Sequence, residues 1–179
     1  MAKREEFKAE HKEILDRCLA AFVSAGTLDL SLDQLAVRVR VSKRMLVHYF
    51  GGREAIEHGA MGRLEDRLRG QFAPEVFPAG VTAEKVVMVL WDRTTAPESR
   101  GILLLVMDVS RRAWNGSERA REFIDEQQRL WRELLEKSIP EKGAAEQLLQ
   151  LFQGAMLAYL VTGDAEPGRR SLLRLLRAK

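Results

Sequence analysis

The sequence has 179 residues, of which 46% are hydrophobic and 31% charged, and its formal net charge is +3. This hydrophobic fraction is ample for a packed core and excludes an intrinsically disordered chain. The single cysteine, Cys18, excludes an internal disulfide and suits a reducing compartment. The start of the chain is charged and has no apolar signal core, and the longest unbroken apolar run, Ile102 to Met107, is far too short to span a bilayer. We therefore expect a soluble cytoplasmic protein with no membrane partner.

The first predicted element is an amphipathic helix that starts near Lys3 or Glu6 and ends at Ala25. Gly26 follows directly and is a natural helix stop. The apolar residues of this segment recur at the spacing of three and four that is typical of a half-buried helix. They are Phe7, Ile14, Leu15, Cys18, Leu19, Phe22 and Val23.

Residues 31–58 predict a helix, a tight turn at 39–41, a second short helix and the start of another. Ser31 can cap the first of these helices and Ser42 the second, because a serine hydroxyl accepts a backbone N–H that the helix start leaves unpaired. Residues 38–53 contain five Lys or Arg and no Asp or Glu. An isolated basic cluster is more often a solvated helix face. The surrounding helix-turn-helix pattern favours a surface that enters a DNA major groove.

The candidate DNA-binding residues lie on the second short helix and beside it. Lys43, Arg44 and His48 are expected to face the groove, with Tyr49 and Arg53 on the phosphate backbone. Arg53 opens the next helix, whose free N–H groups can also bind a phosphate. Val47 can touch a thymine methyl. The full set comprises Ser31, Arg40, Ser42, Lys43, Arg44, Met45, Val47, His48, Tyr49 and Arg53.

Residues 14–61 resemble the DNA-binding domain of the TetR family of bacterial transcriptional regulators. The matching pieces are ILD-x-x-L-x-x-F before a glycine, a capped helix with Leu-Ala at its middle, VSK-x-x-L-x-HYF, and a basic–acidic pair that opens the next helix. The match covers about a quarter of the chain. The resemblance implies a homodimeric repressor that binds a palindromic operator in double-stranded DNA. It also implies release of the operator when a small hydrophobic effector enters the C-terminal domain.

The sequence departs from the usual family pattern at three positions. Arg40 stands in the turn where the family often has glycine. If its φ is positive, this costs roughly 1–2 kcal/mol relative to glycine. Met45 and Val47 stand where the family often has a small polar residue and an aromatic residue.

The rest of the chain predicts helices only, because no segment alternates apolar and polar residues over several positions. We expect an all-α fold of about nine helices. A three-helix helix-turn-helix domain would occupy 1–52, and a helical effector-binding and dimerisation domain would occupy 53–179. After a proline-rich connection at 73–80, Thr82 and Ser117 are expected caps and Gly163 an expected stop. The expected helix ranges are 53–71, 83–93, 97–114, 118–139 and 141–162, followed by a last helix from Pro167.

Large apolar residues from four of these helices form a candidate ligand pocket. Methionine adapts to irregular shapes, and ligand sites are mostly apolar with a few polar anchors. Asp108 is the anchor of most interest because it follows a six-residue apolar run. Ordinary core packing is the alternative for every member of the set. The set comprises Trp91, Met107, Asp108, Trp131, Phe152, Met156 and Tyr159.

Two apolar helix faces near the C-terminus are candidates for a dimer seam. One lies within 144–160, and the last helix adds leucines on a segment too short to bury them alone. Two such helices per subunit could form a four-helix seam, or they could complete the core of one subunit. The family resemblance favours the seam. Its candidate residues are Leu148, Leu151, Ala155, Leu172, Leu173 and Leu176.

Catalytic and metal-binding patterns are missing from the sequence. His11, His48 and His58 are scattered, and there is no HExxH, nucleophile elbow, P-loop or dinucleotide fingerprint. We expect neither an enzyme nor a metal or other cofactor. The alternative function is a helical small-molecule-binding or dimeric interaction module that has lost DNA binding. The departures at 40, 45 and 47 favour this alternative, and the basic segment 38–53 argues against it.

Overall fold

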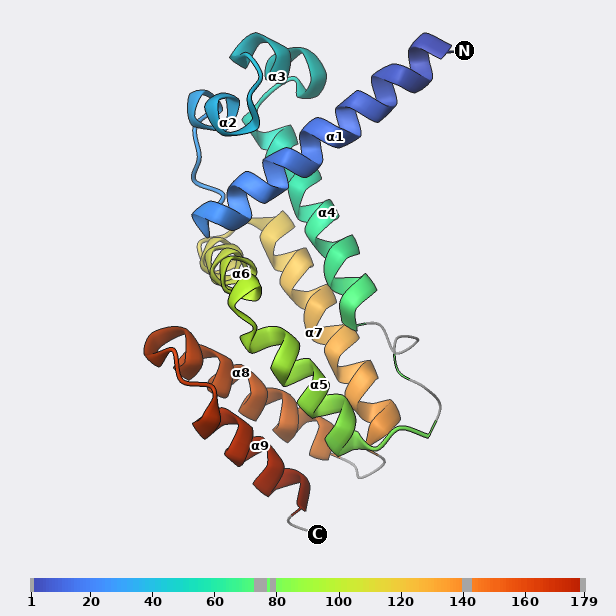
Figure 1. The fold of residues 1–179 in the computed structure, drawn as a ribbon, viewed down its shortest axis with the longest axis vertical. Coiled ribbons are helices and arrows are strands. Elements are labelled where there is room, and N and C mark those ends of the chain that lie inside the picture. The colour runs from blue at the N-terminus through green and yellow to red at the C-terminus, as the bar shows by residue number, and fades with distance from the viewer. Residues whose placement is uncertain (1, 73–76, 78–79, 140–142, 178–179) are drawn as a thin grey trace. The chain divides into compact units, whose positions relative to one another are not determined.

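The computed structural model describes residues 2–72, 77, 80–139 and 143–177. These residues form nine α-helices, one short 3-10 turn at Pro97–Ser99 and no strand (Figure 1). The predicted all-α class is therefore confirmed. The helices are α1 (Ala2–Ala25), α2 (Leu32–Val39), α3 (Lys43–Phe50), α4 (Arg53–Phe72), α5 (Ala83–Thr95), α6 (Arg100–Trp114), α7 (Glu118–Ser138), α8 (Ala144–Thr162) and α9 (Glu166–Arg177).

Most helix ends lie where the local signals predict them. Gly26 and Gly163 both have positive φ, of 67° and 74°, and end α1 and α8. The Thr82 hydroxyl accepts the Lys85 N–H and caps α5. Pro97 opens a 3-10 turn, and α6 itself begins only at Arg100. The predicted start of α8 at residue 141 and most of the connection 73–80 lie outside the described residues.

Contacts between residues divide the chain into two compact units. Unit 1 contains residues up to 67 together with 104–123, and unit 2 contains 68–103 together with 124 to the end. The first part of α4 and the last part of α6 therefore group with the helix-turn-helix segment. The predicted domains, in contrast, are two continuous segments that meet after residue 52. This boundary remains a prediction.

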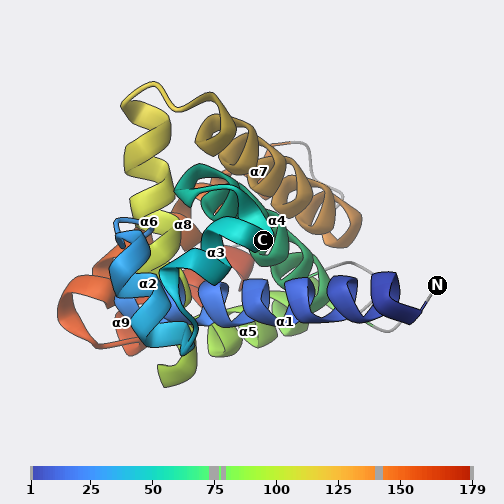
Figure 2. The same ribbon diagram turned by 90° about the horizontal axis from the view of Figure 1, so that it is seen from above.

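The core of unit 1 is built on α1, most of whose apolar stripe is buried as predicted. Ile14, Cys18 and Phe22 are completely buried, as are Leu35 of α2 and Leu46 of α3. Burial raises the pKa of Cys18 to about 11, so its thiol stays protonated at neutral pH. α2 packs against α1, and α3 packs against α2 (Figure 2). Each short helix is thus anchored by a buried leucine, which leaves its other faces at the surface.

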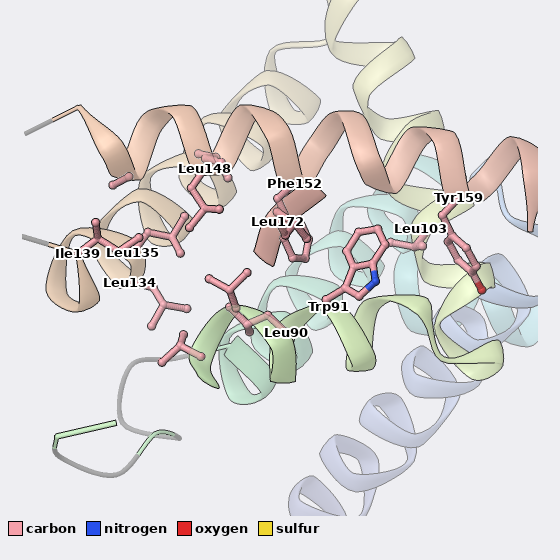
Figure 3. Close-up of a cluster of buried hydrophobic side chains, with 14 residues drawn as sticks. Leu90, Trp91, Leu103, Leu134, Leu135, Ile139, Leu148, Phe152, Tyr159 and Leu172 are labelled. Atoms are coloured by element: carbon pink, nitrogen blue, oxygen red, sulfur yellow. The ribbon is translucent and has the colours of Figure 1, made fainter. Parts of the chain in front are cut away.

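The core of unit 2 gathers side chains from α5, α7, α8 and α9, together with Leu103 near the start of α6 (Figure 3). Trp91 belongs to this core and is completely buried. Gly168 of α9 is packed against the Trp91 indole so closely that a Cβ at this position would lie 2.5 Å from the ring. The absence of a side chain at Gly168 therefore allows α9 to approach α5.

None of the described helices combines the length and apolar character that a membrane span requires.

Candidate nucleic-acid interface

Two serine caps position the helices of the predicted interface. The Ser31 hydroxyl accepts the Gln34 N–H at 3.2 Å, and the Gln34 side chain accepts the Ser31 N–H at 2.8 Å, which forms a capping box. The Ser42 hydroxyl accepts the Met45 N–H at 3.1 Å and starts α3. Ser31 and Ser42 were predicted to bind DNA, and in this structure their hydroxyls act as helix caps.

The turn between α2 and α3 depends on a left-handed residue. Arg40 has φ 57° and ψ 44°, and its N–H donates to the Val37 carbonyl at 3.3 Å. The Val41 N–H closes the same turn on the Ala36 carbonyl at 3.1 Å. Among the described residues, Arg40 alone combines a side chain with a positive φ. The turn therefore contains a left-handed arginine, in a conformation that glycine would adopt without the strain that a side chain adds.

Arg40→Gly is expected to stabilise the protein by about 0.5–1 kcal/mol, because relief of left-handed strain outweighs the extra freedom of glycine in the unfolded chain. Urea denaturation followed by circular dichroism measures the change. Arg38→Gly is the matched control, since it removes an exposed arginine from the last turn of α2 and should destabilise by roughly 0.5 kcal/mol. If both variants lost the same free energy of unfolding, the turn at Arg40 would not be strained.

α3 presents a mixed basic and apolar surface. Leu46 faces inward as predicted, whereas Lys43 and Arg44 are exposed. Met45 and Val47 are large apolar side chains at the surface, 36% and 43% exposed. The Lys43 ammonium lies 2.9 Å from an Asp33 carboxylate oxygen on α2, an exposed pair of the kind that contributes little and exchanges readily.

Aromatic rings hold the second half of α3 against the start of α1. The Phe7 ring lies 4.9 Å from Tyr49 and 6.1 Å from His48, and His11 lies 4.5 Å from Phe50. Phe7 and His11 were not predicted to belong to this site. The stripe pattern assigned Phe7 to the core, and only the folded structure brings α1 beside α3. We infer that these rings fix the orientation of α3.

Arg53 and Asp108, which were assigned to different sites, are brought together in unit 1. They belong to an ion-pair network that joins the loop before α2, the start of α4 and the end of α6. Its members are Asp29, Arg53, Glu57, Asp108, Arg111 and Arg112.

Asp108 anchors the α1–α2 loop to α6. Its carboxylate accepts the Leu28 N–H at 2.9 Å and the Thr27 hydroxyl at 3.1 Å, and it pairs with Arg111 at 2.7 Å and Arg112 at 3.1 Å. Burial by itself would raise the pKa of Asp108. The hydrogen bonds from Leu28 and the two arginines outweigh burial and lower the pKa below its ordinary value. Its partners support a structural role rather than the predicted role of ligand anchor.

Arg53 and Glu57 form the α4 side of the network. Arg53 lies 2.7 Å from Glu57 and 3.4 Å from Asp29, and donates to the Leu28 carbonyl at 3.2 Å. Burial raises the pKa of Glu57, and the nearby Arg53 and Arg112 offset this only in part. Arg53, predicted to bind a phosphate, is thus already engaged by two carboxylates.

The predicted ligand-binding residues are divided between the two units. Trp91, Phe152 and Tyr159 are buried in unit 2, and Trp131 and Met156 pack against the same core. Met107 and Asp108 belong to unit 1. The Trp91 indole N–H donates to the Ala165 carbonyl at 3.2 Å, and the Tyr159 hydroxyl donates to the Thr95 carbonyl at 2.8 Å. These satisfied polar groups fit the alternative that the sequence left open, ordinary core packing.

The predicted dimer residues are partly used inside the subunit. Leu148 and Leu172 are 1% and 0% exposed, so they are unavailable to a second copy in this structure. Leu151, Ala155 and Leu176 are partly buried against the same core, and Leu173 is also half-buried. The exposed side of α8 is a different stripe at helical spacing. It comprises Gln147, Gln150, Gly154, Leu157, Ala158 and Val161.

No group of three or more His, Cys, Asp or Glu side chains within the described ranges is arranged to hold a metal ion.

Comparison with solved structures identifies the fold. A regulator assigned to the TetR family from Rhodococcus sp. superposes with a TM-score of 0.73 at 18% identity, covering 94% of this chain and 97% of that one. A transcriptional regulator from Streptomyces coelicolor A3(2) gives 0.69 at 23% identity, covering 93% and 97%. A TetR-like regulator from Rhodococcus sp. RHA1 gives 0.66 at 18% identity, covering 92% of each chain. The predicted resemblance to the TetR family is confirmed at the level of the fold.

Comparison with curated proteins gives two relatives from Pseudomonas putida. The uncharacterised HTH-type transcriptional regulator TtgW is 27% identical over 97 residues, which are 53% of this chain and 70% of the relative. The HTH-type transcriptional regulator SrpR is 27% identical over 104 residues, or 56% of this chain and 47% of the relative. No family model matches the chain. The expectation of a regulator rather than an enzyme agrees with the descriptions of these relatives.

Proposed function

We propose that this chain, which has the fold of the TetR-family regulators, is a DNA-binding transcriptional regulator that acts as a homodimer on a palindromic operator. The observation that supports this most directly is the geometry of 31–53. Two capped helices joined by a left-handed turn leave the basic face of α3 exposed. A short exposed helix of this kind, held on a second helix, fits a major groove.

Each side of α3 is suited to a different part of the operator. The Arg44 guanidinium can donate two hydrogen bonds to one guanine, at its O6 and N7 atoms. His48 adds a further polar group to the same surface. Met45 and Val47 offer apolar contact to thymine methyls. We therefore propose half-sites that contain both guanine and thymine.

Arg44→Ala is expected to weaken binding to a preferred operator by about 1–3 kcal/mol and to relax base preference at one position in each half-site. The operator would be selected from a random duplex pool, and affinity would be measured by fluorescence anisotropy. Arg121→Ala, which removes an exposed arginine from α7, is the matched control and should bind like the wild type. Unchanged base preference in Arg44→Ala would show that Arg44 does not read a base.

Regulation by a small hydrophobic molecule and repression of the bound gene are part of the same proposal. Trp131 and Met156 lie only partly buried on the core of unit 2, where a ligand could reach them. If an effector binds there and releases DNA, linkage requires DNA to weaken effector binding by the same factor. Titrating tryptophan fluorescence with and without operator tests this reciprocity.

We place the dimer contact on the exposed stripe of α8. Leu157 and Val161 are 54% and 80% exposed, and Gly154 and Ala158 are small enough to let a second helix approach. The double variant Leu157→Glu with Val161→Glu is expected to be monomeric at micromolar concentration, because it places charges in an apolar contact. Sedimentation velocity measures the change. Trp114→Glu, at an 89% exposed apolar side chain on α6, should remain dimeric. A wild-type monomer would contradict the proposal.

A module without DNA binding is the second candidate function. It is favoured by the ion pairs of Lys43 and Arg53, which neutralise two of the five cations in 38–53. Binding to random duplex DNA separates the two functions. A regulator should bind with an affinity that falls steeply as salt rises, since binding releases counterions.

A further inference from the structure

Arg53 and Arg112 contact the same two carboxylates. Arg112 lies 2.6 Å from Oδ1 of Asp29, and Arg53 lies 3.4 Å from that same oxygen. At Glu57 the nearer arginine is Arg53 instead. Arg53 lies 2.7 Å from Oε1, and Arg112 lies 3.3 Å from Oε2. An arginine at the start of α4 and one near the end of α6 therefore share their counterions.

The two arginines are held to different degrees. Arg112 uses Nε for Asp108, Nη1 for Glu57 and Nη2 for Asp29, and its side chain is 19% exposed. Within the described part of the chain, Arg53 contacts Glu57, Asp29 and Leu28 through Nη2, and its side chain is 40% exposed. The Arg53 Nε is buried without a hydrogen-bond partner. Such an unpaired donor is costly, so the present position of Arg53 is the easier of the two to leave.

From this difference we infer that Arg112 is a positioning residue for DNA binding, which releases Arg53 to a DNA phosphate by compensating Asp29 and Glu57. The inference rests on the proposed function and extends it to a residue on α6. When Arg53 turns to a phosphate, Arg112 and Arg111 remain on Asp29, and Arg112 remains on Glu57. Without Arg112, departure of Arg53 would leave the Glu57 carboxylate, 17% exposed, with no ion-pair partner among the residues that the structure describes. Leaving a largely buried charge uncompensated is strongly unfavourable.

Through Arg112, the position of α6 affects how tightly Asp29 and Glu57 hold Arg53. Asp108 pairs with both Arg111 and Arg112 and fixes them beside the α1–α2 loop. Any displacement that withdraws Arg112 would leave Asp29 and Glu57 to hold Arg53. The network therefore couples the position of α6 to one phosphate contact per subunit.

The test uses the full chain and a fluorescein-labelled duplex of mixed sequence, titrated between about 50 and 200 mM salt. Arg112→Gln is expected to bind roughly fivefold or more weakly, with a salt slope lower by about one unit for each subunit bound. Arg53→Gln should show the same two changes. The double variant should resemble Arg53→Gln alone, because both substitutions remove the same phosphate contact.

Two further variants separate this effect from a general loss of charge or folding. Arg119→Gln is the matched control, since Arg119 also pairs with a carboxylate of α4, Glu65, at 2.9 Å, but does not contact the network. It should keep the wild-type affinity and slope. Glu57→Gln, alone or added to Arg112→Gln, removes the carboxylate that retains Arg53 and should raise affinity. The affinity of Glu57→Gln alone tests the inference even if Arg112→Gln folds poorly.

Several outcomes would overturn the inference while leaving the proposed function intact. These are a wild-type salt slope in Arg112→Gln, fully additive losses in the double variant, or weaker binding by Glu57→Gln. Failure of the wild type to bind any duplex would overturn the proposed function and this inference together. The two failures are therefore distinguishable.

Discussion

Replacement of Trp91 by alanine is expected to lower the free energy of unfolding by about 3–5 kcal/mol, the range typical of a buried tryptophan. The indole is completely buried, lies edge-on to Phe152 at 5.4 Å and donates to the Ala165 carbonyl. Gly168 of α9 packs directly on its ring. The variant would leave a cavity between α5, α8 and α9 and an unpaired carbonyl, so it should destabilise the whole core of unit 2.

Chemical denaturation followed by far-ultraviolet circular dichroism measures this loss. Trp114→Ala is the matched control, because Trp114 is 89% exposed and its removal should change stability by less than about 0.5 kcal/mol. The result also decides between the two interpretations that the sequence left open for Trp91. A loss below about 1 kcal/mol would indicate a loosely packed pocket wall instead of a core residue.

The helix ends and the turn were predictable because their causes are local. A serine hydroxyl caps the N–H three residues ahead at both Ser31 and Ser42, and glycine at 26 and 163 adopts the left-handed conformation that ends a helix. Each signal lies within a few residues of its effect. The same locality explains why the strain at Arg40 could be anticipated from one departure in a familiar turn.

The sites depended on distant contacts and were predicted less well. Asp108 was identified as unusual because it follows an apolar run, but its partner Leu28 is 80 residues away in the chain. The spacing of apolar residues gives no sign that residues 28 and 108 are in contact. The sequence therefore groups Asp108 with the candidate ligand pocket. For the same reason, the sequence predicts a phosphate contact for Arg53 and gives no sign of its carboxylate partners. Its partner Asp29 lies on a loop whose position only the folded structure gives.

The dimer face illustrates a different difficulty. An amphipathic helix shows which side is apolar, but core packing and a subunit seam require the same pattern. The leucines at 148 and 172 belong to the predicted seam, but both are buried in the core of unit 2. The exposed stripe of α8 mixes Gln, Gly and Ala with Leu157 and Val161, so its hydrophobic signal is weak.

Asp108→Ala is expected to destabilise the protein by about 3 kcal/mol, because it removes a largely buried carboxylate together with the hydrogen bonds and ion pairs that this carboxylate accepts. The side chain of Asp108 is 9% exposed. The Leu28 N–H would lose its acceptor, and Arg111 and Arg112 would lose a counterion. Thermal or urea unfolding measures the loss. Asp125→Ala, at an exposed position on α7, should be nearly neutral.

The pH dependence of stability gives a sharper test of the same residue. The hydrogen bonds and arginines around Asp108 lower its pKa below the ordinary value of 3.8, despite its burial. A carboxyl whose pKa is lower in the folded state binds fewer protons there than in the unfolded chain. Its stabilising contribution is therefore present above pH 3.8 and is lost as the pH falls through the lower folded pKa. The difference in unfolding free energy between the wild type and Asp108→Asn should shrink as the pH is lowered from 6 toward 3. A difference that stays constant over this range would mean that the charge of Asp108 does not hold the α1–α2 loop to α6.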